Sequence, residues 1–417
     1  MKPPPITSAA NGSWRPLALL AGLSVAGWLA AALWPAWLAK LGISDYGSAY
    51  LDTQALLAAF DAMRGGADPH AVNPLDPLLR YHVYSDWWLA LRWLGLTREH
   101  NFLVGTAFAG AFAVTAWVTA RPRTWGEAGW LAALMISPPF LLALNRGNND
   151  LVIFVLLAGC GLAVRAGSWR WLAATGCLVL ATGLKYYPVV AGLAFLWIPP
   201  GRWRWLRWLG APLAAILALA TVWDQMERSR FVIGSGIHSM GAPLWWRDLG
   251  WEAADAVWPG LLLIASVALA LVRGRATAGL ATRGEPAERL RAAVGAVVVL
   301  GCFLAGMNYA YRWIFILWPA LWLWRQAGDG SLPSRQLWAA RVGCLLAALC
   351  LWLDGLLALV VNLRPALDIS VVGHIQYVYR LWTQPLHWLL MALLAGWLLE
   401  AAWTFVNEAR ANPVRQG

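Results

Sequence analysis

"FLVGTAFAGAFAVTAWVTA", residues 102–120, contains no charged residue and is long enough to cross the hydrocarbon core of a membrane as a helix. Three further apolar runs, with few or no charges, occupy residues 17–39, 291–306 and 342–361. None of them alternates between apolar and polar residues in short segments, as the strands of a membrane barrel do. These runs predict a helical membrane protein.

The composition of the whole chain leads to the same class. Of its 417 residues, 60% are hydrophobic, only 13% are charged and 31 are tryptophan. A soluble protein of this length cannot bury so much apolar surface. The basic residues concentrate in short loops, so the positive-inside rule accounts for the net charge of +11 and no nucleic-acid partner is expected.

The five cysteines lie inside apolar segments and show no spacing typical of a metal site or of paired loop positions. We interpret them as small residues of the helix core. They are Cys160, Cys177, Cys302, Cys344 and Cys350.

Hydropathy predicts an all-α integral membrane protein with about twelve transmembrane helices in one domain, residues 1–417. We expect helices at residues 17–39, 101–120, 127–144, 149–165, 170–184, 187–199, 207–223, 256–272, 291–307, 312–324, 340–361 and 385–406. Prolines bracket the short segment 187–199, which makes it a candidate half-helix or re-entrant piece.

The placement of arginine predicts the orientation of the chain. Short arginine-rich loops alternate with longer loops of mixed sign at residues 40–100, 224–255 and 362–384. The positive-inside rule then assigns both termini to the cytoplasm and the three longer loops to the outer face. We interpret the first apolar run as a retained signal anchor, so a multi-pass protein of the cell (inner) membrane is expected.

Four polar clusters fall at the outer ends of the predicted spans. They are "SDYGSAYLDTQ" (44–54), "NRGNND" (145–150), "GLKYYPV" (183–189) and "GMNYAYRW" (306–313). Ionisable groups at membrane depth are costly, so a shared outer cavity is the natural interpretation. A plainer alternative is that Arg146, Lys185 and Arg312 each extend to the membrane surface. That alternative leaves their Asn and Tyr neighbours unexplained.

Helix capping is a second plain role for part of this pattern. Either Asn148 or Asn149 suits the first position of the fourth expected span, and Asp150 suits its positive end. Capping and a binding site are compatible with each other.

The first outer loop begins with a helical pattern. Apolar residues recur at near-helical spacing over residues 50–63, which predicts an amphipathic helix lying on the membrane surface. Asp52 and Asp61 lie on this helix, and "GGADPH" (65–70) ends it. Simple exposure to solvent is the alternative role for these carboxylates and for Asp45.

These motifs together resemble the polyprenol-phosphate-mannose-dependent mannosyltransferases of glycosyltransferase family 87, within the GT-C superfamily. The family has an Asp in the first outer loop, then Gly-x-Asp-x-Tyr. Here Asp52 precedes Gly66, Asp68 and His70, and His70 departs from the usual Tyr. "RGNND", "GLKYYP" and "NYAYR" are similar to the family's later motifs. The resemblance covers about residues 1–330.

The resemblance implies a GT-C-type helical bundle that works at the outer face without a metal or other cofactor. A polyprenyl-phosphate sugar is then the donor, a glycolipid or glycan hydroxyl is the acceptor, and a mannosyl group is the usual cargo. Asp52 is the candidate general base, with Asp45 as the fallback. The candidate ligands of the donor phosphate are Arg146, Lys185 and Arg312. Supporting residues are Asn148, Asn149, Asp150, Tyr186, Asn308, Tyr311 and His238.

Three other functions remain open at this level. A transporter or flippase of lipid-linked sugars also needs a charged cavity, but its polar groups usually lie near the middle of the membrane. An enzyme of the O-antigen-ligase or polymerase type usually has a large outer loop late in the chain, whereas 362–384 is short. A non-catalytic scaffold leaves Asp52, Arg146 and Lys185 unexplained.

Overall fold

The computed structural model describes residues 14–43, 49–164, 168–197, 206–229, 238–248, 250, 253–277, 283–306, 308–363 and 369–411. Within these ranges the chain is almost entirely helical, and the strands β1 (Ser239–Met240) and β2 (Asn308–Tyr309) form one short antiparallel pair. The protein is therefore all-α in its described part, as the hydropathy of the sequence predicts.

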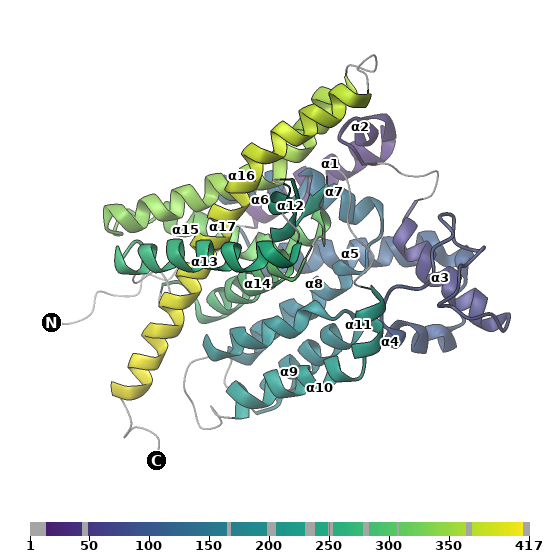
Figure 1. Cartoon of the computed structure of the whole chain (residues 1–417). Helices are drawn as coiled ribbons and strands as arrows, with labels where there is room; N and C mark the ends of the chain where they lie inside the picture. Colours follow the sequence, from purple (N-terminus) through teal and green to yellow (C-terminus); the bar gives the residue numbers. More distant parts are fainter. Residues whose placement is uncertain are drawn as a thin grey trace.

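The N-terminal elements are α1 (Arg15–Leu33), α2 (Pro35–Lys40), α3 (Leu51–Arg64), α4 (Asp86–Leu89), η1 (Ala90–Leu94) and η2 (Arg98–His100). The next elements are α5 (Asn101–Ala120), α6 (Trp125–Met135), α7 (Pro138–Asn145), α8 (Asp150–Gly159), η3 (Cys160–Val164), α9 (Ser168–Leu184), η4 (Tyr187–Trp197), η5 (Leu206–Gly210), α10 (Ala211–Ala220) and α11 (Trp223–Ser229). The C-terminal part contains α12 (Ala242–Asp248), α13 (Ala253–Arg273), α14 (Pro286–Ala305), η7 (Ala310–Ile316), α15 (Leu317–Ala327), α16 (Ser334–Asn362) and α17 (Ile369–Ala411). Figure 1 shows α3 at one end of the long helices.

Four described helices are long and apolar enough to cross a membrane. They are Arg15–Leu33, Arg98–Ala120, Ser334–Asn362 and Tyr377–Thr404. Helices α6 and α7 would make a fifth if they form one broken span. Shorter apolar helices cover Asp150–Leu162, Tyr187–Leu196, Trp208–Ala220 and Gly260–Arg273. The described chain thus fits a membrane-embedded protein.

Prolines explain where the helices depart from the predicted spans. The expected helix at 127–144 is broken, because Pro138 and Pro139 cannot donate backbone hydrogen bonds, and α6 and α7 meet at 58°. The segment 362–384, expected to be a loop, is helical from Ile369 onward, where α17 begins, and a candidate membrane span starts within it at Tyr377. Pro385 lies inside α17 instead of starting a helix, since one missing backbone bond is tolerated in so long an element.

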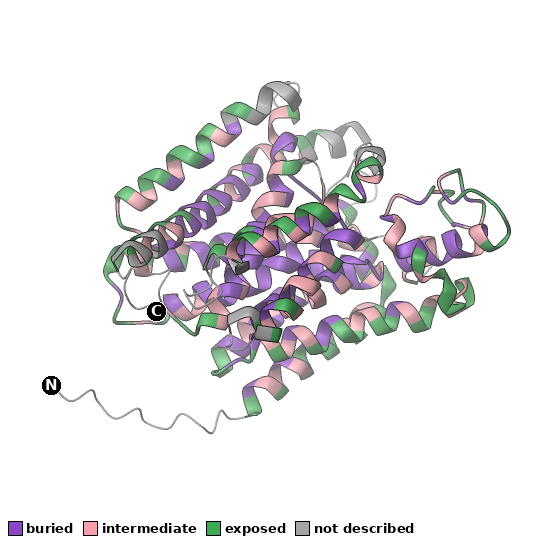
Figure 2. Cartoon of the chain, turned by 90° about the horizontal axis from the view of Figure 1, so that it is seen from below, coloured by how far each residue is buried: buried purple, intermediate pink, exposed green. Residues whose placement is uncertain are grey.

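Aromatic packing fills the centre of the bundle. Phe154 of α8 lies 4.2 Å from Trp318 of α15 and 4.8 Å from Phe112 of α5, measured between ring centroids. Side chains such as Trp313 and Phe315 are fully buried beside them. In Figure 2 the buried residues concentrate in the inner helices, whereas exposed residues lie on the peripheral ones. Such packing fixes the helix ends that carry the polar motifs.

The segment from α3 to η2 has a small apolar core of its own. Leu57 and Phe60 of α3 are buried against Trp88 and Leu89 of α4. The predicted helix is confirmed, but the apolar face that was expected to contact lipid is buried. Because its apolar face packs inside the protein, that face does not lie in lipid. This packing holds the start of α3 over the main bundle.

Candidate functional site

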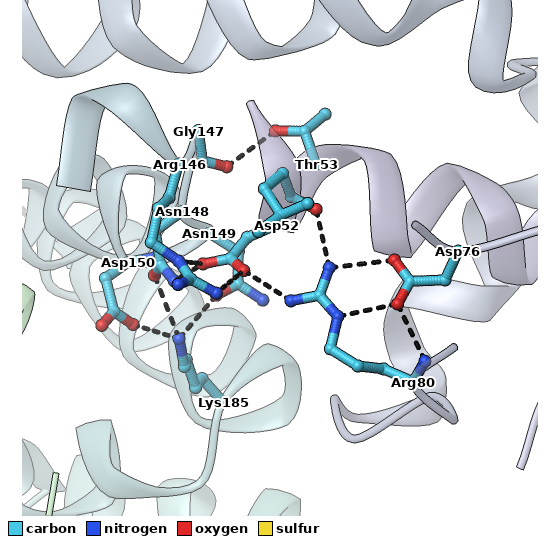
Figure 3. A network of polar contacts seen from close by, with 11 residues as sticks. Asp52, Thr53, Asp76, Arg80, Arg146, Gly147, Asn148, Asn149, Asp150 and Lys185 are labelled. Atoms are coloured by element: carbon cyan, nitrogen blue, oxygen red, sulfur yellow. Dashed lines mark hydrogen bonds and ion pairs between the residues drawn. The ribbon is translucent and has the colours of Figure 1, made fainter. Parts of the chain in front are cut away.

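Backbone hydrogen bonds fasten the start of α3 to the loop between α7 and α8. Tyr50 N donates to Asn145 O at 3.0 Å, and Asp52 N donates to Arg146 O at 2.8 Å. The Thr53 hydroxyl adds a bond to Gly147 O at 2.7 Å. Two of the polar motifs, far apart in the sequence, therefore meet through their main chains, and Figure 3 shows the bond from Thr53 to Gly147 at this junction.

This junction requires glycine at position 147. Gly147 has a φ of +54°, a conformation that is unfavourable for side chains with a β-carbon. A β-carbon there would also lie 2.5 Å from Thr53 Oγ1 and 2.8 Å from Tyr50 Cβ. The close approach of Thr53 and Tyr50 thus explains the glycine in the Arg-Gly-Asn sequence.

Asp52 is the centre of the cluster. Arg146 donates to both of its carboxylate oxygens, from Nε at 2.9 Å and from Nη2 at 2.6 Å. Asn148 Nδ2 donates at 2.6 Å, and Arg80 Nη1 donates at 3.1 Å. Asp52 is only 3% exposed. Burial raises its pKa, but attraction and hydrogen bonds from Arg146, together with Arg80, outweigh burial and hold the pKa at about 2.

A second acid–base group surrounds Asp150 at the start of α8. Lys185 Nζ lies 2.5 Å from Asp150 Oδ1, and the Tyr187 hydroxyl donates to the same oxygen at 2.7 Å. Arg312 Nε lies 3.9 Å from Oδ2, and its guanidinium stands 4.8 Å from the Tyr187 ring centroid. Asp150 is fully buried and Lys185 is 6% exposed, so these charges compensate each other away from solvent.

Asn148 connects the two groups. Its amide nitrogen donates to Asp52, while its Oδ1 accepts from Asp150 N at 2.9 Å and from Lys185 Nζ at 3.4 Å. Asn149 Oδ1 accepts from Lys185 at 2.5 Å. The expected capping role is thus carried by Asn148, since Asn149 precedes α8 but its side chain caps nothing. Arg146, Lys185 and Arg312 therefore belong to one continuous network.

Tyrosine rings form a wall beside these cations. Tyr309 and Tyr311 stack at 5.5 Å between ring centroids. The Arg146 guanidinium lies 5.6 Å from the Tyr309 centroid, and Lys185 Nζ lies 5.7 Å from that of Tyr311. The predicted residue Tyr311 is thus part of the cluster, and its neighbour Tyr309 joins it.

Three predicted supporting residues have contacts that shape nearby turns. Asn308 Nδ2 donates to Cys302 O and Gly306 O, which closes the turn after α14. His238 Nε2 lies 2.6 Å from Leu41 O, next to the β1–β2 pair. Tyr186 donates to Val83 O at 3.4 Å. In "KYY" the tyrosine that bonds to Asp150 is therefore Tyr187.

The Gly-x-Asp-x-His segment builds a turn. Gly66 has a φ of +80°, and Asp68 Oδ1 accepts from His70 N at 2.9 Å. His70 Nε2 then lies 3.2 Å from Asp86 Oδ1 and ties the turn to α4. The fallback base Asp45 lies outside the described residues.

Arg80 and Asp76 are site residues that the sequence alone did not identify. Arg80 makes two hydrogen bonds with the Asp76 carboxylate, at 2.8 and 2.9 Å, while also reaching Asp52. Their i,i+4 spacing in "DPLLR" was the available signal. Only the fold of the loop brings the Arg80 side chain into contact with α3.

The chemistry of the cluster suits an anion of single charge. Four cations and three carboxylates leave a formal balance of +4 − 3 = +1. They are Arg80, Arg146, Lys185 and Arg312 with Asp52, Asp76 and Asp150. The described residues contain no group of three or more His, Cys, Asp or Glu side chains suited to a metal ion.

Comparisons of the chain with protein-family models, with curated proteins and with solved structures find no match. What the fold and the site define is a class: a protein that is all-α in its described part, with helices suited to a membrane and a buried charged cluster where α3 meets the loop between α7 and α8. Its function must be inferred from its own residues.

Proposed function

We propose that this protein is a membrane glycosyltransferase. It moves a hexosyl group, mannosyl in the family that the chain resembles, from a polyprenyl-phosphate sugar to a hydroxyl of a glycolipid or glycan. The observation that carries the proposal is the buried network that joins the Asp52 carboxylate to Arg146 and Lys185. It supplies a proton acceptor and phosphate ligands within one site.

The proposed reaction needs only groups of this kind. The acceptor hydroxyl oxygen forms a bond to the anomeric carbon, and the bond from that carbon to the phosphate oxygen breaks. The hydroxyl proton passes to Asp52, and the leaving group is the polyprenyl phosphate. Negative charge grows on the phosphate in the transition state, where cationic donors stabilise it. Lys185, Arg312 and Arg146 are the proposed donors.

The charge of the donor matches the surplus of the cluster. A sugar phosphodiester carries one negative charge, and the seven charged side chains have a balance of one positive charge. In the free protein Arg146 is bound to Asp52. We propose that the donor phosphate draws Arg146 away, which leaves the Asp52 carboxylate open to the acceptor hydroxyl.

We propose about twelve passes in a GT-C-type bundle, with the shorter apolar helices completing the long ones. Both termini are placed in the cytoplasm and the charged cluster at the outer face of the inner membrane. The arginine-rich short loops support this orientation.

The test is a transfer assay with purified protein in detergent or lipid nanodiscs. Polyprenyl-phosphate mannose, glucose and other hexoses are each supplied with an extract of membrane glycolipids, and products are identified by mass spectrometry. A product heavier by one hexose supports the proposal when it is absent with Asp52→Asn. Movement of the donor across a vesicle membrane without transfer would instead favour a flippase.

A further inference from the structure

Arg80 approaches Asp52 from the side opposite to Arg146. Its Nη1 donates to Asp52 Oδ1, and its Nη2 donates to Leu51 O at 2.9 Å. Its remaining bonds go to Asp76, whose side chain is 1% exposed. Figure 3 shows Arg80 between the two carboxylates, with Asp52 between the two arginines.

The anchoring of Arg80 differs from that of Arg146. Asp76 holds Arg80 through its side-chain Nε and Nη2 and also accepts from Arg80 N at 2.9 Å. The preceding residue, Leu79, has a φ of +54° and is 58% exposed, so the backbone turns sharply to send Arg80 inward. Arg80 is thus fixed by its own loop, whereas the side-chain bonds of Arg146 to a carboxylate go to Asp52 itself.

Donor binding would move Arg146 but leave Arg80 in place. If Arg146 turns to a phosphate, Asp52 stays buried and loses its closest cation. A buried carboxylate without a cation tends to take up a proton, and a protonated Asp52 cannot act as a base. A second cation that stays beside Asp52 keeps the carboxylate ionised.

We propose that Arg80, anchored by Asp76, is a positioning residue that keeps the Asp52 carboxylate ionised and oriented while Arg146 holds the donor phosphate. This inference rests on the proposed glycosyltransferase function. It assigns Arg80 no contact with the substrate.

The variants that test it are Arg80→Gln and Arg80→Lys, with the double variant Asp76→Asn/Arg80→Gln. The single change to Gln leaves Asp76 buried without its cation and could unfold the loop. The double variant removes that charge and still takes the cation from Asp52. Arg64→Gln is the matched control, because Arg64 pairs with Asp61 within α3 and lies outside the charged cluster.

In the transfer assay we expect the double variant to lower kcat about 10-fold or more at pH 7, with little change in the donor KM. The acid limb of its pH–rate profile should move to higher pH, so that activity recovers as pH rises. Arg80→Lys should recover part of the rate. A loss that is equal at every pH, or a double variant that behaves as wild type, would overturn the proposal.

A measurement without substrate separates this inference from the proposed function. The thermal midpoint of the purified protein is followed from pH 7 down to pH 3. The double variant should be less stable than wild type at pH 7 and should lose less stability as pH falls below about 4, because its Asp52 carboxylate contributes less to the fold above the unfolded pKa. When Asp52→Asn is also present, this difference in acid sensitivity should vanish. If wild type transfers no sugar, the proposed function fails, and this measurement still decides whether Arg80 holds the charge of Asp52.

Discussion

Asp52 accepts two hydrogen bonds from the guanidinium of Arg146, at 2.6 and 2.9 Å, across 94 residues of sequence. In the free protein the candidate base is therefore paired with a candidate phosphate ligand. Such a pair keeps both charges compensated in a site that excludes solvent. An anionic donor could exchange places with the carboxylate, because both present oxygens to the same planar fork of donors.

Replacing Asp52 with Asn should slow transfer strongly but preserve donor binding. The change removes the proposed base, so we expect kcat to fall by about 10²–10⁴-fold. It also leaves Arg146 and Arg80 without this counter-charge, so the donor should bind as tightly as before or more tightly. Kinetics and equilibrium binding of a non-transferable donor analogue measure the two effects.

Two further variants test whether Asp52 is the base. Asp61→Asn is the control, and Asp45→Asn tests the fallback base. Asp61 pairs with Arg64 and Arg98 on the far side of α3, so its change should leave transfer near the wild-type rate. If Asp52→Asn is fully active and Asp45→Asn is not, the base moves to Asp45. Full activity in both would remove the carboxylate mechanism.

The pH dependence of stability should reveal the ion pairs of Asp52. Its pKa is lowered from 3.8 to about 2 in the folded protein. A lowered carboxylate pKa stabilises the fold above the unfolded value, and this contribution is lost as pH falls from about 4 to about 2. The shift corresponds to about 2 kcal/mol. Thermal unfolding of wild type should show this loss, and Asp52→Asn should lack this part of it.

The sequence was sufficient to predict a helical chain suited to a membrane, because the length of an apolar run is a local signal. Both expected ends agree with the structure at α5, and the C-terminal end agrees at α9, where the apolar runs stop at Arg121 and Lys185. The expected ends failed where a proline could either break or bend a helix, as at Pro138 and Pro385. The outcome there depends on packing against neighbouring helices.

The site was predictable in part for a similar reason. Asp52, Arg146, Asn148 and Lys185 belong to short polar motifs in apolar surroundings, and the structure brings them together. Arg80 lies in a polar loop, where its i,i+4 spacing from Asp76 is the available signal and does not point to Asp52. Only the folded loop shows that it reaches Asp52, so periodicity and hydropathy cannot find it.

Gly147→Ala should destabilise the junction between α3 and α8. The added β-carbon meets Thr53 Oγ1 at 2.5 Å, and the backbone has a positive φ. We expect a loss of roughly 1–3 kcal/mol and weaker activity, because Arg146 is displaced. Gly110→Ala is the control, since a β-carbon at this helical position in α5 has no atom within 4 Å. Equal thermal midpoints for the two variants would contradict the close approach of Thr53 to Gly147.

Cysteine labelling should establish the orientation of the chain. Ala67→Cys, at an exposed position after α3, should react with a membrane-impermeant maleimide in intact spheroplasts. Gly330→Cys, in the exposed connection between α15 and α16, should react only after the membrane is opened. Wild type supplies the background, because four native cysteines are buried and Cys177 is partly buried. The reverse pattern would place the charged cluster in the cytoplasm.

The ion pair between Lys185 and Asp150 allows the effect of Lys185 on folding to be separated from its effect on donor binding. Lys185→Met leaves the fully buried Asp150 without its closest cation, at 2.5 Å. Removing one partner of a buried ion pair costs roughly 3–5 kcal/mol. The double variant Lys185→Met/Asp150→Asn removes both charges and should regain most of the lost thermal stability.

That stable double variant then tests the phosphate role of Lys185. Its donor affinity should fall together with its turnover, because a phosphate contact is lost in both the ground state and the transition state. The Asn at position 150 can still bond to Tyr187, so the start of α8 should keep its place. Wild-type affinity in a folded double variant would assign the donor phosphate to Arg146 and Arg312 alone. A single variant as stable as the double would show that the buried pair does not form.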